Sequence, residues 1–123
     1  MKVRIQDNSI RFRLKQFEVE ALSEKEIVKE VISFGDEEKD QLQFVLQAGN
    51  SDFKLEQERT IIQLNIPERV VNEWTQTDLV GFEQKITTVK GKEINILVEK
   101  DFKCLDRSDE DEVGSYPNPM KQC

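Results

Sequence analysis

A pattern of apolar residues occurs twice in this chain, 52 residues apart, and it limits the folds that the chain can adopt. In residues 9–22 (SIRFRLKQFEVEAL), apolar side chains alternate with polar ones up to Leu14, and helical spacing follows. The apolar positions Ile10, Phe12, Leu14, Val19 and Leu22 correspond to Ile62, Leu64, Ile66, Val71 and Trp74. The correspondence continues without a gap through Val28 and Val80. We therefore expect two copies of one unit, at about residues 1–51 and 52–102.

Each copy is predicted to contain strands before and after one helix. In the first copy, the patterns predict strands at 2–5, 9–15, 27–34 and 41–48 and a helix at 16–24. In the second, they predict strands at 53–57, 60–66, 79–86 and 92–99, with Pro67 opening the helix. Asp7 and Asn8 suit a tight turn because both residues tolerate positive φ, and Lys90-Gly91 predicts a second hairpin. Trp74 is expected in the core.

These elements predict a mainly antiparallel α+β fold of about eight strands and two short helices. A sheet of this size removes its exposed edges by closing, so we expect a barrel. A single domain is expected to cover residues 1–102. Residues 103–123 are acidic, contain prolines and are expected to form a tail that packs on this domain or extends from it.

The charge of the chain excludes two classes of partner. A net charge of −7 disfavours nucleic acids and anionic membranes, and no apolar run is long enough to span a bilayer. The first residues lack the apolar stretch of a signal peptide, so a cytoplasmic location is expected. Residues 1–16 carry five basic side chains and one acidic, a net +4, whereas residues 99–112 carry seven acidic and three basic, a net −4.

The order of elements resembles the CYTH-like barrel of the triphosphate tunnel metalloenzymes, in which a repeated strand–helix–strands unit surrounds a polar channel. That resemblance implies hydrolysis of a phosphoanhydride with a bound metal. Those enzymes carry Glu-x-Glu-x-Lys on the first strand, whereas this chain has RFRLK at residues 11–15. Separately, the phrases VRIQDNSIRFRLKQFEVEAL, ILVEKDFKCL and YPNP resemble a family of small, uncharacterised bacterial proteins, and this second resemblance covers nearly the whole chain.

The first candidate site is a row of cations on one strand face. Long cationic side chains bind phosphate or carboxylate groups, and the fork of an arginine grips two oxygens at once. If the barrel is polar inside, Gln43, Gln63, Asn65 and Asn95 would line the same channel. The candidate anion-binding residues are Arg4, Arg11, Arg13, Lys15 and Lys85.

The second candidate site lies in the tail, where Cys104, Cys123 and Asp106 are potential metal ligands. The two cysteines can instead be free thiols or form a disulfide. Nucleophilic catalysis has little support, since the chain has no histidine and no phosphate-binding glycine loop. No cofactor is expected, apart from a divalent metal under the enzyme hypothesis, where its ligands would be Glu83, Glu93 or Glu99.

Three functional hypotheses follow. The first is a binding or interaction domain whose basic strand face accepts an anionic small molecule or an acidic protein segment. The second is a tunnel-type phosphoanhydride hydrolase. The third is a structural role, in which the acidic tail of the chain neutralises the basic face.

Overall fold

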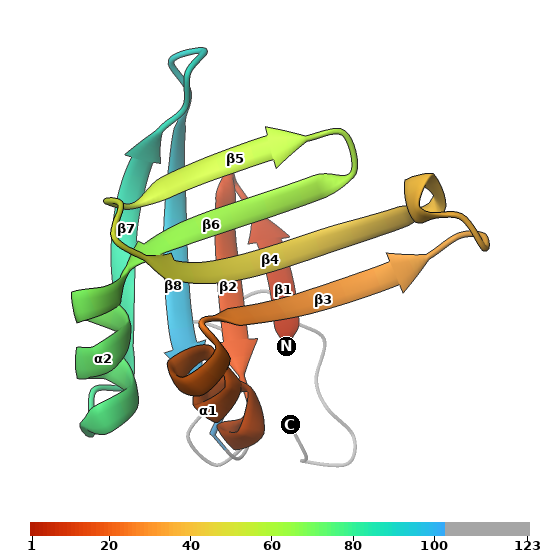
Figure 1. Ribbon diagram of the computed structural model, residues 1–123. Helices are drawn as coiled ribbons and strands as arrows, with labels where there is room; N and C mark the ends of the chain where they lie inside the picture. The colour runs from red at the N-terminus through yellow and green to blue at the C-terminus, as the bar shows by residue number, and fades with distance from the viewer. Residues whose placement is uncertain (103–123) are drawn as a thin grey trace, which may run out of the picture.

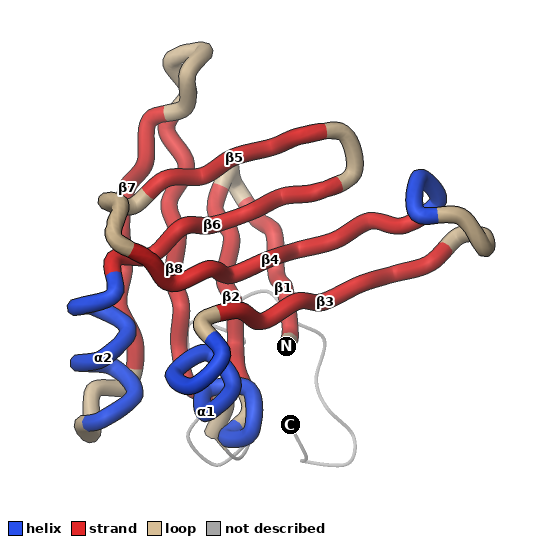
Figure 2. Tube along the Cα trace, in the orientation of Figure 1, coloured by secondary structure: helices blue, strands red, loops and turns tan. Residues whose placement is uncertain are grey.

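The computed structural model describes residues 1–102, in which two helices and eight strands form a repeated order of elements. The order is strand, strand, helix, strand, strand, and it occurs twice (Figures 1 and 2). The first set is β1 (Lys2–Gln6), β2 (Ser9–Leu14), α1 (Gln16–Lys25), β3 (Ile27–Ser33) and β4 (Gln41–Gly49), with a short 3-10 helix, η1 (Glu38–Asp40), before β4. The second set is β5 (Lys54–Glu58), β6 (Ile61–Pro67), α2 (Glu68–Gln76), β7 (Gly81–Thr87) and β8 (Glu93–Lys100).

The strands form two four-stranded mixed sheets, which we call sheet A and sheet B. The strand order is β1-β2-β8-β7 in sheet A and β3-β4-β6-β5 in sheet B. Each sheet therefore takes one antiparallel hairpin from each set, and the two hairpins are joined by a parallel pairing of β2 with β8 or of β4 with β6. In Figure 1 the strands of sheet B cross over those of sheet A, as in an orthogonal packing of two sheets.

The α+β class, the eight strands and the two helices agree with the sequence prediction, but closure into a barrel is not confirmed. Within residues 1–102, no strand pairing joins sheet A to sheet B. The two central pairings are parallel, so the sheets are less uniformly antiparallel than expected. Each sheet buries one face against the other, which removes apolar surface from water without closing the sheet edges.

The sequence predicted that equivalent positions of the two sets are always 52 residues apart. This prediction is wrong for β3 and its equivalent β7. Glu83 pairs with Leu97, whereas Lys29 pairs with Val45. Positions in β7 therefore lie 54 residues after their equivalents in β3 (83 − 29), while β8 lies 52 after β4 (97 − 45). The cause is the connection into the strand: Glu26 alone separates α1 from β3, but residues 77–80 separate α2 from β7.

The tight turns confirm the predicted backbone conformations. Asp7 and Asn8 have φ values of 49° and 59°, which a two-residue hairpin turn with its mirror-image geometry requires. The equivalent turn between β5 and β6 uses Arg59 at φ 53°. Gly91 adopts φ 84° in the turn between β7 and β8. Pro67 differs slightly from expectation, because it ends β6 and caps α2, which begins at Glu68.

The space between the sheets is apolar. Phe12 of β2 meets Phe44 of β4 edge to face, with ring centroids 6.4 Å apart. Trp74 is fully buried, as expected, and its indole N–H donates to the carbonyl oxygen of Val80 at 3.0 Å. The buried apolar cluster consists of Ile10, Phe12, Leu14, Val19, Leu22, Val28, Leu46, Ala48, Leu64, Ile66, Val71, Trp74, Ile86, Ile96 and Val98.

One buried carboxylate attaches the first residue to helix α1. Glu18 accepts a hydrogen bond from the backbone N–H of Lys15 at 3.0 Å and another from the α-ammonium of Met1, which also donates to Glu30 at 2.7 Å. Burial lowers the pKa of the Met1 α-ammonium, but its hydrogen bonds to the two carboxylates outweigh this effect and raise that pKa above its usual value. Folding therefore favours the protonated amine.

Candidate functional site

The cationic row of β2 lies on the outer face of sheet A. Ile10, Phe12 and Leu14 enter the core, so the alternation of side chains along a strand directs Arg11 and Arg13 to the opposite face. The same alternation in β8 buries Ile96 and Val98 and leaves Asn95, Leu97 and Glu99 on the outer face. The expectation that the arginines share one face is met, and that face points away from the core.

Strand pairing arranges these outward side chains in rows across the sheet. Arg4 of β1 lies directly opposite Arg11, which pairs in turn with Leu97, and Leu97 pairs with Glu83 of β7. We call this set, Arg4–Arg11–Leu97–Glu83, the central row. The next row contains only polar residues, Gln6, Ser9, Asn95 and Lys85, and the row on the other side contains Lys2, Arg13, Glu99 and Gly81.

An ion-pair cluster holds the arginines of β2. Nε of Arg13 donates to Oε1 of Glu99 at 2.6 Å, and the same oxygen lies 3.7 Å from Nε of Arg11. The three side chains are between 19% and 28% exposed, which places this cluster between a surface ion pair and a buried one. Arg4 donates to the amide oxygen of Gln6 at 3.0 Å. Glu99, a metal ligand under the enzyme hypothesis, thus binds arginines.

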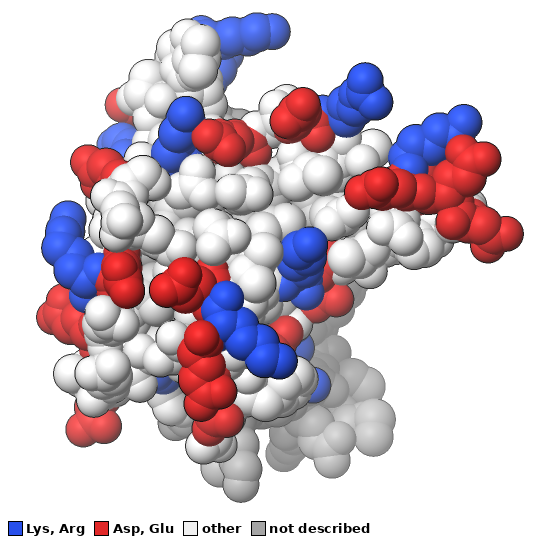
Figure 3. Space-filling model, viewed as in Figure 1, with Lys and Arg blue, Asp and Glu red and all other residues white. Residues whose placement is uncertain are grey.

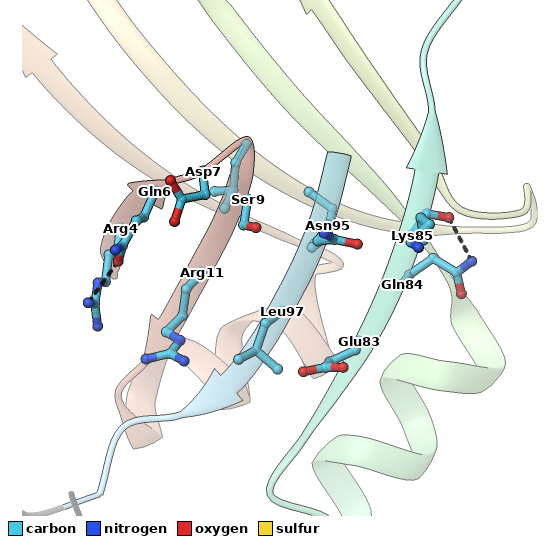
Figure 4. Close-up of a pocket in the computed structure, with 12 residues that line it drawn as sticks. Arg4, Gln6, Asp7, Ser9, Arg11, Glu83, Gln84, Lys85, Asn95 and Leu97 are labelled. Carbon is cyan, nitrogen blue, oxygen red and sulfur yellow. Dashed lines mark hydrogen bonds between the residues drawn. The ribbon is translucent and has the colours of Figure 1, made fainter. Parts of the chain in front are cut away.

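A cavity of about 850 Å³ occupies this outer face, which is within the usual range for small-molecule sites. Figure 4 shows Arg4 and Arg11 on one side of it and Glu83 and Lys85 on the other, with Asn95 and Leu97 of β8 between them. Three cationic and two acidic side chains line the cavity. Its lining residues are Arg4, Gln6, Asp7, Ser9, Ile10, Arg11, Glu83, Gln84, Lys85, Asn95, Ile96 and Leu97.

The structure brings together some of the predicted site residues and separates others. Arg4, Arg11 and Lys85 line the cavity, and so does Glu83. Arg13 and Glu99 lie in the adjoining row. Lys15 does not line the cavity, because the strand ends at Leu14 and Lys15 caps helix α1, with its side chain exposed. Glu93 begins β8 and is exposed, and it does not line the cavity either. Cys104, Asp106 and Cys123 lie outside the described residues.

The predicted polar channel does not form. Gln43, Gln63 and Asn65 belong to the outer face of sheet B, whereas Lys85 and Asn95 belong to the outer face of sheet A. Apolar side chains fill the space between the sheets, so the two polar sets face opposite directions. Figure 3 shows the sheet B side, where uncharged side chains occupy most of the middle and charged ones gather towards the rim.

Sequence reasoning missed several residues that line the cavity, among them Ser9, Asp7 and Leu97. They reach one site because β2 pairs in parallel with β8, a strand more than 80 residues further along the chain. No local signal predicts such a pairing. Leu97 in particular fits the alternation of β8 as a residue on the outer face, but nothing near it in the sequence places it beside Arg11.

Comparison with protein families classifies the chain. A family model described as a family of unknown function (DUF7009) matches residues 1–120. The chain belongs to this family. The expected likeness to a family of uncharacterised proteins is thereby confirmed. No curated protein and no solved structure matches the chain, so the resemblance to the tunnel metalloenzymes is not confirmed.

The described part of the chain offers no preassembled metal site. Within residues 1–102, no group of three or more acidic, cysteine or histidine side chains is arranged to hold a metal ion. The same residues contain no helix with the length and apolar character needed to cross a membrane. The lining of the cavity offers guanidinium, ammonium, carboxylate, amide and hydroxyl groups, which can bind a polar ligand.

Proposed function

We propose that this family member is a binding domain whose cavity on the outer face of sheet A accepts an anionic group, either a phosphate or a carboxylate. The observation that carries the proposal is the position of Arg4 directly opposite Arg11 at the wall of the cavity. Two guanidinium groups on neighbouring strands, about 5 Å apart at their Cα atoms, can grip one anion from two sides.

The pairing of cations across this hairpin also supports the proposal. Like charges directly opposite each other in a sheet are destabilising. The β1–β2 hairpin contains two such pairs, Arg4 with Arg11 and Lys2 with Arg13. Glu99 compensates part of this repulsion, since it binds Arg13 closely and Arg11 at longer range. A bound anion would place a further negative charge beside Arg4 and Arg11.

Neutral donors would complete the site. Ser9 and Asn95 lie opposite each other in the polar row beside the central row, and both line the cavity. A hydroxyl and an amide can donate hydrogen bonds to anion oxygens that the arginines leave free. Lys85, on the far side of Asn95, adds a third positive charge.

The test compares anion binding by the wild-type chain and by Arg4→Gln and Arg11→Gln variants. At constant ionic strength, orthophosphate, pyrophosphate and citrate should raise the melting temperature of the wild type, because a ligand that binds only the folded state stabilises it. Each substitution should weaken binding by roughly tenfold or more, since hydrogen bonds to charged groups contribute about 1.5–3 kcal/mol each. Arg69→Gln, at an exposed position of helix α2, is the matched control and should bind like the wild type. Equal thermal shifts in all four proteins would refute the proposal.

The hydrolase alternative has less support from the described residues. Glu99 binds arginines, Glu93 does not line the cavity, and Glu83 is the one acid of that hypothesis that does. The anion-binding assay separates the two functions. Release of phosphate from a bound triphosphate in the presence of magnesium or manganese would favour the enzyme, whereas reversible binding without release would favour the binding domain.

The structural alternative, in which the acidic tail neutralises the basic face, also has a contact in its favour. The backbone N–H of Asp101 donates to the carbonyl oxygen of Leu14 at 2.8 Å, and its carboxylate lies 3.2 Å from Nζ of Lys2. The chain thus leaves sheet A next to the Arg13 row. If the tail is the natural occupant, neutralising its acids at positions 106 and 109–112 in the full chain should lower stability at low salt and less so at high salt.

A further inference from the structure

The central row has opposite charges at its two ends. Arg4 and Arg11 lie on β1 and β2, and Glu83 lies on β7. Leu97 of β8 separates Arg11 from Glu83, so the middle of the row is apolar. Because neighbouring strands are spaced by about 4.8 Å, Arg11 and Glu83 are separated by about 10 Å at their backbone positions. All four residues line the same cavity (Figure 4).

Glu83 has no side-chain partner among the described residues. Within residues 1–102 it makes no ion pair and no side-chain hydrogen bond, and its side chain is exposed. Lys85 lies two positions along the same strand, at about 7 Å along it, and forms no ion pair with Glu83. The carboxylate of Glu83 is therefore accessible to a cation from solution.

We propose that the natural ligand is zwitterionic, with an anionic group at Arg4 and Arg11, an apolar segment over Leu97 and a protonated amine at Glu83. This inference rests on the proposed anion-binding function and adds the chemical class of the ligand. An ω-amino acid, a short peptide or an amino-alkyl phosphate has this order of groups. A ligand of this class satisfies both charged ends of the row, whereas a simple anion leaves the carboxylate of Glu83 facing the ligand.

The rival class is a ligand with two anionic groups. Lys85 would hold the second group, because it lines the cavity on the same side as Glu83. For such a ligand Glu83 is a repulsive neighbour. The two classes thus predict opposite effects of the same two substitutions: removing the charge of Glu83 weakens binding of a zwitterion and strengthens binding of a dianion, and removing the charge of Lys85 does the reverse.

Three carboxylates of matched chain length test the proposal: 6-aminohexanoate as the zwitterion, hexanoate as the anion and adipate as the dianion. Their affinities are measured by calorimetry with the full chain at constant ionic strength. The wild type should bind 6-aminohexanoate roughly two- to fivefold more tightly than hexanoate, the range expected for one partly exposed ion pair. Glu83→Gln should remove this preference, and Lys85→Gln should preserve or increase it. Glu58→Gln, exposed on β5 of sheet B, is the matched control and should leave it unchanged.

The outcomes separate this inference from the function on which it rests. Preference for adipate that Lys85→Gln removes, or equal binding of all three probes by the wild type and Glu83→Gln, overturns the zwitterion proposal and leaves anion binding intact. Failure of all three probes to bind, together with no response to phosphate or citrate, overturns both.

Discussion

Replacement of Glu99 by glutamine should weaken the fold while strengthening the binding of anions. Oε1 of Glu99 accepts the 2.6 Å hydrogen bond from Arg13 and lies 3.7 Å from Nε of Arg11. Glutamine preserves the size of the side chain but removes the negative charge that the two arginines share. The substitution therefore increases the electrostatic repulsion between two partly buried cations, Arg11 and Arg13.

The size of the effect follows from the burial of the cluster. Exposed ion pairs contribute about 0–1 kcal/mol, whereas breaking a buried pair costs about 3–5 kcal/mol. The side chains of Arg11, Arg13 and Glu99 are 28%, 23% and 19% exposed. We expect an intermediate loss of about 2 kcal/mol in the free energy of unfolding. For a domain of this size, that loss lowers the melting temperature by about 8 °C.

Urea unfolding of Glu99→Gln, Arg13→Gln and the double variant measures this contribution directly. The sum of the losses in unfolding free energy for the two single variants should exceed the loss for the double variant by about 1–2 kcal/mol, which is the coupling energy of the pair. Asp101→Asn is the control, because its partner Lys2 is 66% exposed, and it should change stability by less than about 0.5 kcal/mol. A loss below about 0.5 kcal/mol for Glu99→Gln would refute the assignment of stability to this cluster.

The same variant reports on the site. If the proposed anion contacts Arg11, Glu99 competes with it for that guanidinium group, and neutralising Glu99 should tighten the binding of orthophosphate by roughly two- to fivefold at constant ionic strength. General damage to the fold would lower both stability and affinity, so a variant that is less stable but binds the anion more tightly supports a specific effect at the site. If affinity stays constant while stability falls, Arg11 does not contact the anion and the site must be placed elsewhere on the face.

Two further predictions concern the scaffold. Because the pKa of the Met1 α-ammonium is raised in the folded state, its contribution to stability is complete below about pH 8 and is lost as the pH rises through the folded-state value. Glu18→Gln should flatten this loss in urea unfolding measured from pH 7 to pH 10, and an unchanged profile would contradict the anchoring role. Gly81→Ala should cost about 1–3 kcal/mol, because its Cβ would lie 2.5 Å from the carbonyl oxygen of Val98. Gly49→Ala, with open space around its added Cβ, should cost less than about 0.5 kcal/mol, and urea unfolding of both glycine variants measures the difference.

Local patterns in the sequence predicted most elements to within two residues. Alternation along β2 identified its buried and exposed faces, and Asp7-Asn8 identified the first turn, because these properties depend on neighbouring residues alone. The pairing of β2 with β8 depends on contacts between residues more than 80 positions apart, and no pattern encodes it. The expected barrel is not confirmed for a related reason. The need to protect sheet edges favours closure, but the long-range strand pairings decide whether one closed sheet or two separate sheets form.

The sequence predicted only the part of the candidate site that lies on β1 and β2. The cations of β1 and β2 were visible as a row, whereas their placement beside Leu97 and Glu83 came from the assembled sheet. Lys15 illustrates the opposite error. It continues the cationic alternation in the sequence, but the helix begins one residue later and takes Lys15 out of the strand. Alternation predicts a shared face only as far as the strand extends.

Comparison of the two outer faces argues that the arginines serve a purpose beyond folding. The rows of sheet B occupy equivalent positions in the same order of strands, and there Gln63 and Asn65 take the places of Arg11 and Arg13. Sheet B forms with these neutral amides, so the architecture does not require a guanidinium group at either position. The hairpin of sheet A instead places cations directly opposite each other, an arrangement that needs acidic partners such as Glu99 to offset the repulsion. An arrangement of charges that the equivalent sheet does without is expected where a ligand makes use of it.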